Sequence, residues 1–409
     1  MKKPTLWRIW ILIPVAGLWM VLAGTQSSPP DWGAATSWNR TYGGPEDETP
    51  HPVFQTSDGG YVVAGSSWSY DMGDYYDAWL VKTGPTGEVQ WTRTFGGVAG
   101  DEIRDARQTA DGGFVLAGIT HSFSPGYHGD FWLIRTDDGG REVWSRNYGG
   151  YESDAGLATR QTADGGYVIA GRTESYGAGG TDAWLVRTDA NGNELWSKTF
   201  GGLEPDVAYS VLETGDGGFV FTGETSSSGA GATDVWLIRT DEDGTELWRR
   251  TFGGVLVDGA HCVQQTADLG YILAGGTMSQ GAGSLDGWLI KTDANGNEQW
   301  NRTFGGADLD LLFFVEQTPD GGYAASGTTY SAGAGGGDVW LVRTDGEGNE
   351  IWSRTFGGAG QDESFWLGLT ADGGTILSAK TQSFGAGEGD FQLIKTDASG
   401  NAPQTPSQP

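Results

Sequence analysis

Short apolar segments alternate with turn-forming residues along most of the chain, and residues 206–254 show the pattern clearly. Residues 207–214, 219–222, 235–240 and 246–252 are rich in Val, Ile, Leu, Phe, Tyr, Trp and Thr. These residue types favour strands, and none of the segments has the spacing of an amphipathic helix. The pattern therefore predicts four consecutive β-strands.

The turn signals between these segments predict antiparallel hairpins. Asp-Gly pairs flanked by apolar runs favour tight turns, because Gly accepts the positive φ that such turns require. A longer hairpin loop is predicted at Asp241-Glu242-Asp243-Gly244. The first turn, Asp216-Gly217-Gly218, has counterparts at Asp58, Asp111, Asp164, Asp320 and Asp372, with Asp268-Leu269-Gly270 as the one departure.

The same four-strand unit recurs along the chain. A phrase of the type Trp-Ser-Arg-Thr-Phe-Gly-Gly opens at Trp38, Trp91, Trp144, Trp196, Trp248, Trp300 and Trp352, in steps of 53, 53, 52, 52, 52 and 52 residues. The third segment of each unit, such as Trp236-Leu237-Ile238, has no polar alternation, which indicates burial on both faces. Sheets of this kind must stack on one another, and a closed ring protects the end sheets. The sequence thus predicts an all-β, seven-bladed β-propeller of four-stranded antiparallel blades.

The two ends of the repeat array predict how the ring closes. The first phrase is a fourth strand without three predecessors, and the last repeat lacks a fourth strand. We therefore expect residues 38–42 to complete the last blade. The predicted organisation is an export signal at 1–24, a linker at 25–37, the propeller at 38–401 and a disordered Pro-rich tail at 402–409.

The repeat resembles a known family. The pattern Trp-x-Arg-Thr-Phe-Gly-Gly, then Asp, then Asp-Gly-Gly-Tyr-Val-x-Ala-Gly, then Asp-x-Trp-Leu-Val-Lys-Thr-Asp looks like the SBBP-type β-propeller repeat. That resemblance implies a secreted or cell-surface bacterial or archaeal protein. More distantly, Asp189-x-x-Gly192-x-x-x-Trp196 is similar to quinoprotein (PQQ-type) propeller repeats. Those proteins usually have eight blades and many carry an adjacent cysteine pair, whereas this chain has seven repeats and one cysteine, so we expect no quinone cofactor.

The N-terminus and the net charge narrow the location and the partners. Lys2, Lys3 and Arg8 precede a short apolar run at 9–24, the layout of a secretory signal, with a retained anchor as the alternative. The formal net charge of −29 disfavours nucleic acid and anionic membrane surfaces. We expect a secreted or cell-surface monomer, with no membrane span in the mature chain. Cys262 is the only cysteine, so no intrachain disulfide can form.

Each repeat carries an acidic residue four positions after its Gly-Gly pair. One interpretation is a ring of carboxylates at the channel mouth that holds a cation such as Ca²⁺. The other, which we favour, is that each carboxylate accepts hydrogen bonds from the backbone of its Gly-Gly turn. The residues are Glu48, Asp101, Asp154, Asp206, Asp258, Asp310 and Asp362.

Two further repeated sets have predicted positions. The third strand begins with Asp and carries Arg or Lys five residues later, as in Asp182 and Arg187; their odd separation places them on opposite faces, which suggests blade-to-blade contacts. A position on the innermost strand varies between blades, as expected for a channel lining. It is occupied by His51, Arg104, Leu157, Tyr209, His261, Phe313 and Phe365.

The loop between the second and third strands differs most between repeats. Blades three to seven have Gly-Ala-Gly sequences there, whereas the first two blades have aromatic and histidine side chains. Such rings with polar tips are typical of carbohydrate or peptide recognition, although they also serve to cover an irregular seam between blades. The predicted ligand-binding residues are Trp68, Tyr70, Tyr75, Tyr76, His121, Phe123, Tyr127 and His128.

The sequence contains no recognised catalytic or phosphate-binding motif. We therefore predict a non-enzymatic propeller that presents a binding surface for a surface glycan or a protein partner. The alternatives are a structural spacer in a cell-surface assembly, and a lyase or glycosidase that uses the carboxylates of the channel mouth.

Overall fold

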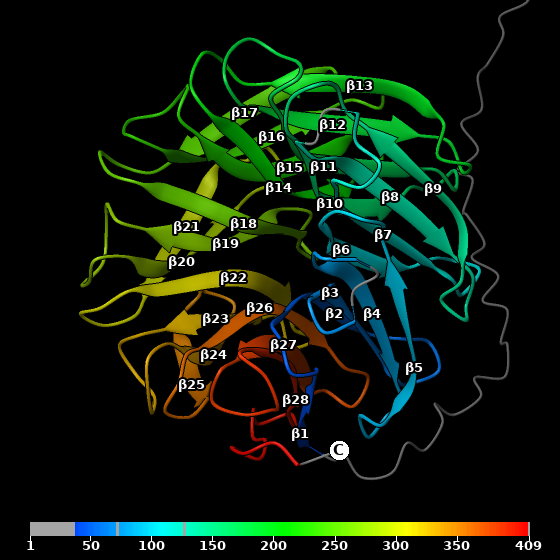
Figure 1. Cartoon of the computed structure of the whole chain (residues 1–409). Helices are drawn as coiled ribbons and strands as arrows, with labels where there is room; N and C mark the ends of the chain where they lie inside the picture. Colours follow the sequence, from blue (N-terminus) through cyan, green and yellow to red (C-terminus); the bar gives the residue numbers. More distant parts are fainter. Residues whose placement is uncertain (1–36, 71–72, 126–127, 408–409) are drawn as a thin grey trace, which may run out of the picture. The chain divides into compact units, whose positions relative to one another are not determined.

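The computed structural model describes residues 37–70, 73–125 and 128–407. Within these residues all regular structure is β, in 28 strands. The strands form seven separate four-stranded antiparallel sheets, which confirms the predicted seven-bladed propeller (Figure 1). The predicted signal at 1–24 lies outside the described residues, as does most of the linker.

Each of the first six blades consists of four strands that are consecutive in sequence and adjacent in space. Blades 1 to 3 comprise β2 (Glu48–Gln55), β3 (Tyr61–Ser67), β4 (Asp77–Thr83), β5 (Val89–Phe95); β6 (Asp101–Gln108), β7 (Phe114–Thr120), β8 (Asp130–Thr136), β9 (Glu142–Tyr148); β10 (Asp154–Gln161), β11 (Tyr167–Thr173), β12 (Asp182–Thr188), β13 (Glu194–Phe200). Blades 4 to 6 comprise β14 (Asp206–Glu213), β15 (Phe219–Thr225), β16 (Asp234–Thr240), β17 (Glu246–Phe252); β18 (Asp258–Gln265), β19 (Tyr271–Thr277), β20 (Asp286–Thr292), β21 (Glu298–Phe304); β22 (Asp310–Gln317), β23 (Tyr323–Thr329), β24 (Asp338–Thr344), β25 (Glu350–Phe356).

The seventh blade is built from both ends of the array. It comprises β26 (Asp362–Leu369), β27 (Thr375–Thr381), β28 (Asp390–Lys395) and β1 (Trp38–Tyr42). β1 pairs with β28 in antiparallel register, with Arg40 opposite Leu393, so the predicted closure is confirmed. Blade 7 also contacts blade 1, where the Ser378 hydroxyl donates to the His51 carbonyl at 2.6 Å and Lys380 pairs with Asp47 at 2.6 Å. The ring is therefore closed by a strand from the opposite end of the chain (Figure 1).

The core lies between the blades, as the unbroken apolar segments predict. Six of the seven third strands, β4, β8, β12, β16, β20 and β28, are buried at every residue, and β24 at all but one. The clusters of buried side chains join neighbouring sheets; one contains Phe131 of blade 2 together with Trp184 of blade 3, whose ring centroids are 4.5 Å apart. A sheet that buries both faces gains its stability from its neighbours, which explains why the repeats close into a ring.

One expectation differs from the structure. Residues 402–407 do not form a free tail: the Asn39 side-chain amide donates to the Pro403 carbonyl at 3.0 Å and the Ser407 amide to the Asn39 carbonyl at 2.9 Å. These bonds satisfy polar groups on the open edge of β1, which has no further strand beside it.

The basic residues of the third strands form ion pairs that the sequence did not predict. Arg187 pairs with Asp164, in the hairpin turn between the first two strands of its own blade, with N–O distances of 2.6–2.7 Å. The same pairing within one blade occurs for Arg135, Arg239, Lys291 and Arg343. Contacts between blades occur as well, because Arg135 hydrogen-bonds to Tyr167 of blade 3 and Arg239 to Tyr271 of blade 5. The ion pair was missed because the side chain reaches along its own sheet to a turn that the strand spacing did not reveal.

Candidate functional site

The repeated carboxylates are buried structural acceptors. In blade 4 the Asp206 carboxylate accepts the Gly202 amide at 2.9 Å and the Ser227 hydroxyl at 2.6 Å. The backbone bond from the second Gly of the Gly-Gly pair recurs in every blade, at 2.7–3.0 Å, on Glu48, Asp101, Asp154, Asp206, Asp258, Asp310 and Asp362. All seven side chains are almost fully buried. These contacts are the ones expected if each carboxylate accepts hydrogen bonds from the backbone of its Gly-Gly turn.

A second carboxylate, at the start of the third strand, leaves no room for a side chain at the first Gly of the Gly-Gly pair. Asp182, at the start of β12, accepts the Ala178 amide at 2.9 Å, and a Cβ on Gly201 would lie only 2.4 Å from Asp182 and 2.5 Å from Asp206. In the described part of the chain, no three His, Cys, Asp or Glu side chains are arranged to hold a metal ion.

The divergent loops of blades 1 and 2 meet around the turn between β5 and β6. The Asp101 amide donates to the Tyr76 carbonyl at 2.9 Å, and the His121 amide to the Gly100 carbonyl at 3.1 Å. Between them lies a cavity of about 590 Å³, which we call the blade 1/2 cleft. It is lined by Tyr75, Tyr76, Val98, Ala99, Gly100 and His121.

The side chains at the cleft include aromatic rings that are exposed to solvent. Tyr75 is 53% exposed and Val98 81% exposed, while Trp68, 41% exposed, packs against Tyr76 with ring centroids 5.4 Å apart. Burial raises the pKa of Tyr76, so its phenol stays protonated at neutral pH and can donate a hydrogen bond. Four of the predicted residues, Trp68, Tyr75, Tyr76 and His121, are thus brought together.

The other predicted residues lie elsewhere. Tyr70 packs on Trp79 and donates its hydroxyl to the Gly43 carbonyl at 3.0 Å, on the opposite side of blade 1. Phe123 packs on Trp132 within blade 2. His128 is exposed and outside the cleft, and Tyr127 lies outside the described residues. The predicted residues are therefore divided, with Trp68, Tyr75, Tyr76 and His121 together and Tyr70 at the seam between blades 7 and 1.

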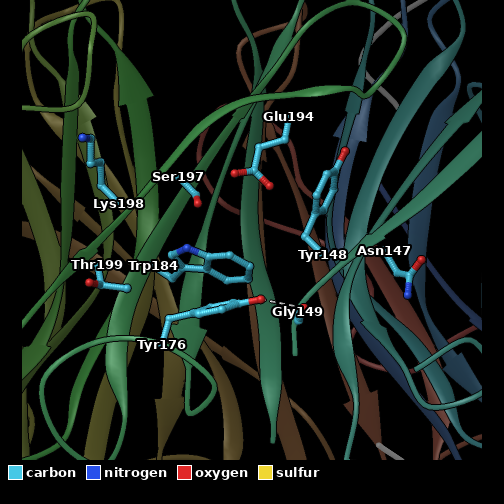
Figure 2. A pocket seen from close by; sticks show the side chains of 9 residues that line it. All are labelled: Asn147, Tyr148, Gly149, Tyr176, Trp184, Glu194, Ser197, Lys198 and Thr199. Atoms are coloured by element: carbon cyan, nitrogen blue, oxygen red, sulfur yellow. Dashed lines mark hydrogen bonds between the residues drawn. The ribbon is translucent and has the colours of Figure 1, made fainter. Parts of the chain in front are cut away.

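A second cavity, of about 550 Å³, lies at the next seam, between blades 2 and 3 (Figure 2). We call it the blade 2/3 groove; it is lined by Asn147, Tyr148, Gly149, Tyr176, Trp184, Glu194, Ser197, Lys198 and Thr199. Tyr176 and Trp184 pack together with centroids 5.3 Å apart, and the Tyr176 hydroxyl donates to the Gly149 carbonyl at 2.9 Å. Figure 2 shows the Glu194 carboxylate directed toward these rings.

Sequence reasoning missed this groove, although a signal for it was present. Asn147 stands where the other blades have Thr, so it departs from the repeat. The Tyr176 position is aromatic in blades 1, 2, 3 and 7 and holds Ser228, Gln280 and Ala332 in blades 4 to 6. A single substitution and an aromatic residue shared by four blades were less conspicuous than the long loops of blades 1 and 2.

A third cavity occupies the centre of the ring. Its volume is about 280 Å³, and its lining comprises the seven predicted channel positions and Trp366, namely His51, Arg104, Leu157, Tyr209, His261, Phe313, Phe365 and Trp366. Each innermost strand therefore contributes the side chain at the variable position, as the variation between repeats predicted, and β26 contributes Trp366 as well.

Comparisons with known proteins agree with the fold. No family model matches the chain. The regulatory protein FlaEY of Caulobacter vibrioides is 26% identical over 204 residues, a match that covers 44% of this chain and 20% of that protein. The chain thus aligns with only a fifth of the relative's length.

Solved structures support the class of protein. The WD40 domain of Neurospora crassa Pan2 has a TM-score of 0.51 at 12% identity, covering 90% of this chain and 92% of that chain. A puromycin hydrolase mutant in complex with PGG has a TM-score of 0.52 at 13% identity, covering 86% and 52%. A Bacteroides caccae protein of unknown function has a TM-score of 0.43 at 14% identity, covering 75% and 94%. Such identities establish the β-propeller fold alone, and the SBBP-type resemblance stays a prediction.

The described residues include no helix with the length and apolar character that crossing a membrane would require.

Proposed function

We propose that this propeller is a non-enzymatic binding protein that holds a glycan at the blade 1/2 cleft and the blade 2/3 groove. The observation that carries the proposal is that two cavities lined by Tyr75, Tyr76 and Tyr176 lie at the seams of blades 1 to 3, whereas the corresponding loop of blade 4 has only small residues. Departures from a repeated scaffold mark positions that the architecture does not require.

The lining of the groove suits a sugar. Tyr176, which is 48% exposed and packs on the buried Trp184, offers an apolar ring face, while Asn147, Glu194 and Ser197 supply hydrogen-bonding groups around it (Figure 2). Few well-placed polar groups around aromatic rings are the usual composition of a small-molecule site. The cleft offers a similar combination, with Tyr75, Tyr76 and His121 around an apolar Val98.

The same lining argues against sugar hydrolysis. Glycosidases of the usual kind use two carboxyl groups that flank the scissile bond. Among the residues that the structure describes, Glu194 is the one carboxylate that lines the groove, and none lines the cleft. The repeated Asp residues are already engaged with backbone amides and hydroxyl groups, so they serve the blade rather than a substrate.

We also propose that the protein acts outside the cytoplasm, in a secreted or cell-surface form. The basic and apolar N-terminal residues, the SBBP-type resemblance and the net charge of −29 support this location. A surface glycan is a ligand that such a protein meets.

A glycan array followed by isothermal titration calorimetry on the full chain tests the proposal. Tyr75→Ala and Tyr176→Ser should each weaken glycan binding about tenfold, the loss typical of removing a central aromatic contact. Ser is already present at the latter position in blade 4, as Ser228, so the second variant should fold normally. Leu247→Ala, at an exposed site on β17, is the matched control and should bind like the wild type.

The alternatives give different results in the same experiment. Array binding that both aromatic substitutions leave unchanged would contradict the assigned sites. If no glycan on the array binds and a protein partner is found whose binding requires Tyr75, the ligand of these sites is a protein and not a glycan. If substituting Trp68, Tyr75 and Tyr176 together abolishes no interaction of the protein, the result would favour a structural spacer.

A further inference from the structure

The central cavity is a distinct candidate site, independent of the two seams between blades. The innermost strands β2, β6, β10, β14, β18, β22 and β26 surround the centre of the ring (Figure 1). The cavity that they enclose measures about 280 Å³, close to the lower end of the range for small-ligand pockets. It therefore has room for one ring-sized molecule.

Aromatic rings form a continuous wall along five of the seven blades. The ring of His261 lies between those of Tyr209, at 5.0 Å, and Phe313, at 5.2 Å. Phe313 and Phe365 follow at 6.2 Å with an interplanar angle of 25°, and Phe365 meets His51 at 5.3 Å. Flat apolar surfaces of this kind favour a planar ligand.

Two imidazoles in this wall have buried nitrogen atoms without a partner. His51 Nε2 and His261 Nδ1 are both buried and make no hydrogen bond in the described part of the chain. His51 is only 8% exposed, so water does not freely solvate it. A buried polar atom without a partner is costly, which indicates that these atoms serve a bound molecule.

Burial also keeps both imidazoles neutral. It lowers the pKa of His261 to about 4, and it lowers that of His51 well below the usual range, with the positive charge of Arg104 adding to the effect. A neutral imidazole has one donor and one acceptor nitrogen. The cavity therefore offers both kinds of hydrogen bond beside an aromatic wall.

We propose that the central cavity binds a small, uncharged, planar nitrogen heterocycle, which stacks on the Phe313 and Phe365 rings and hydrogen-bonds to His51 and His261. Such a ring has donor and acceptor atoms on its edge and apolar faces, which match the two kinds of surface in the cavity.

Other ligand chemistries fit less well. An anion would face a net charge of −29, and the Arg104 guanidinium is already paired with Glu102 at 2.7 Å. A monosaccharide carries more hydroxyl groups than the lining can satisfy. Phe313 and Phe365 separate the two imidazoles along the wall, so a shared metal ion is disfavoured.

The chain itself supplies the test variants, because Phe occupies the same position in blades 6 and 7. His51→Phe and His261→Phe should fold as the wild type does, and each replaces an imidazole by a slightly larger ring without hydrogen-bonding atoms. The probes are adenine, cytosine and benzene, measured by isothermal titration calorimetry and by ¹⁵N NMR of the imidazoles in the full chain at pH 7.5. Circular dichroism checks the fold of each variant.

We expect at least one of the two heterocycles to bind saturably and to shift the nitrogen resonances of His51 and His261. Each single variant should raise the Kd at least tenfold, and the double variant should show no binding. Leu247→Ala, remote from the cavity, should leave the Kd unchanged.

Three results would overturn the proposal. The first is the absence of saturable heterocycle binding, which would mean that the imidazoles are solvated by water alone. The second is benzene binding as tightly as the heterocycles, since that would describe a plain apolar cavity. The third is heterocycle binding that the double variant retains. None of these outcomes bears on the glycan sites.

Discussion

The loops of blades 1 to 3 and those of blades 4 to 6 share one scaffold and differ in what they display. In blade 3 the Ser175 hydroxyl donates to Asp154 at 2.7 Å, and in blade 6 the Ser331 hydroxyl donates to Asp310 at 2.7 Å. The residue after this serine is Tyr176 in the first case and Ala332 in the second. Neighbouring positions of one loop are thus constant or variable according to whether the fold needs their hydrogen bonds.

This contrast separates architecture from function within a repeat protein. A carboxylate accepts from the Gly-Gly backbone in every blade, and the blade 1/2 cleft and the blade 2/3 groove lie beside blades 1 to 3. If this separation is correct, substitutions of the scaffold side chains should lower the free energy of unfolding equally in blades 1 to 3 and in blades 4 to 6. Substitutions of the exposed side chains that line the cavities should lower it little.

The largest expected effect comes from the scaffold carboxylates. Asp101→Ala and Asp310→Ala should each destabilise the fold by about 3–5 kcal/mol, because each removes a buried carboxylate that accepts hydrogen bonds from a backbone amide and from a serine hydroxyl. Urea unfolding followed by circular dichroism measures the loss. Asp308→Ala, at an exposed aspartate two residues from Asp310, is the control and should change stability by less than about 0.5 kcal/mol. Unequal losses for Asp101 and Asp310 would show that the halves differ in architecture as well.

The second largest effect depends on pH and compares the stability of the wild type, which has His261 at the variable channel position, with that of His261→Phe. The pKa of His261 is about 4 in the fold and 6.5 as a free side chain, so the unfolded chain binds more protons between these values. The wild type should therefore lose about 3 kcal/mol of stability as the pH falls from 6.5 to 4, beyond any loss in His261→Phe. Above pH 7 the difference between the two should be constant. Urea unfolding at pH 4.5, 5.5 and 7.5 measures it, and parallel curves across the whole range would contradict the burial of a neutral imidazole.

The propeller was predictable because the signals are periodic. Seven copies of the phrase at Trp38 to Trp352 determine the number of blades, and the incomplete ends of the array determine the closure by β1. The seven channel positions were also predictable, because side chains on the innermost strands meet at the axis.

The sites were less predictable, because they depend on where a side chain turns within its seam. Tyr70 and Tyr75 lie five residues apart in one loop, yet Tyr70 bonds to Gly43 and Tyr75 lines the blade 1/2 cleft. The partner of Arg187 was missed for the same reason, since the sequence gives the face of a strand but not the reach of a long side chain.

The smallest effect concerns a departure from the repeat that has no proposed function. Leu269 has φ +67°, a left-handed conformation that the corresponding glycines, such as Gly321 at φ +88°, adopt without strain. Leu269→Gly should stabilise the protein by about 0.5 kcal/mol, since relief of backbone strain of about 1 kcal/mol exceeds the added freedom of the unfolded chain. Gly321→Leu should cost about 0.5 kcal/mol, because a Cβ there meets no other atom within 4 Å and only the backbone strain, less the lost freedom of the unfolded chain, opposes it. Differential scanning calorimetry of both variants measures these shifts. Destabilisation by Leu269→Gly would mean that the leucine side chain makes a contribution of its own, and blade 5 would then no longer count as plain scaffold.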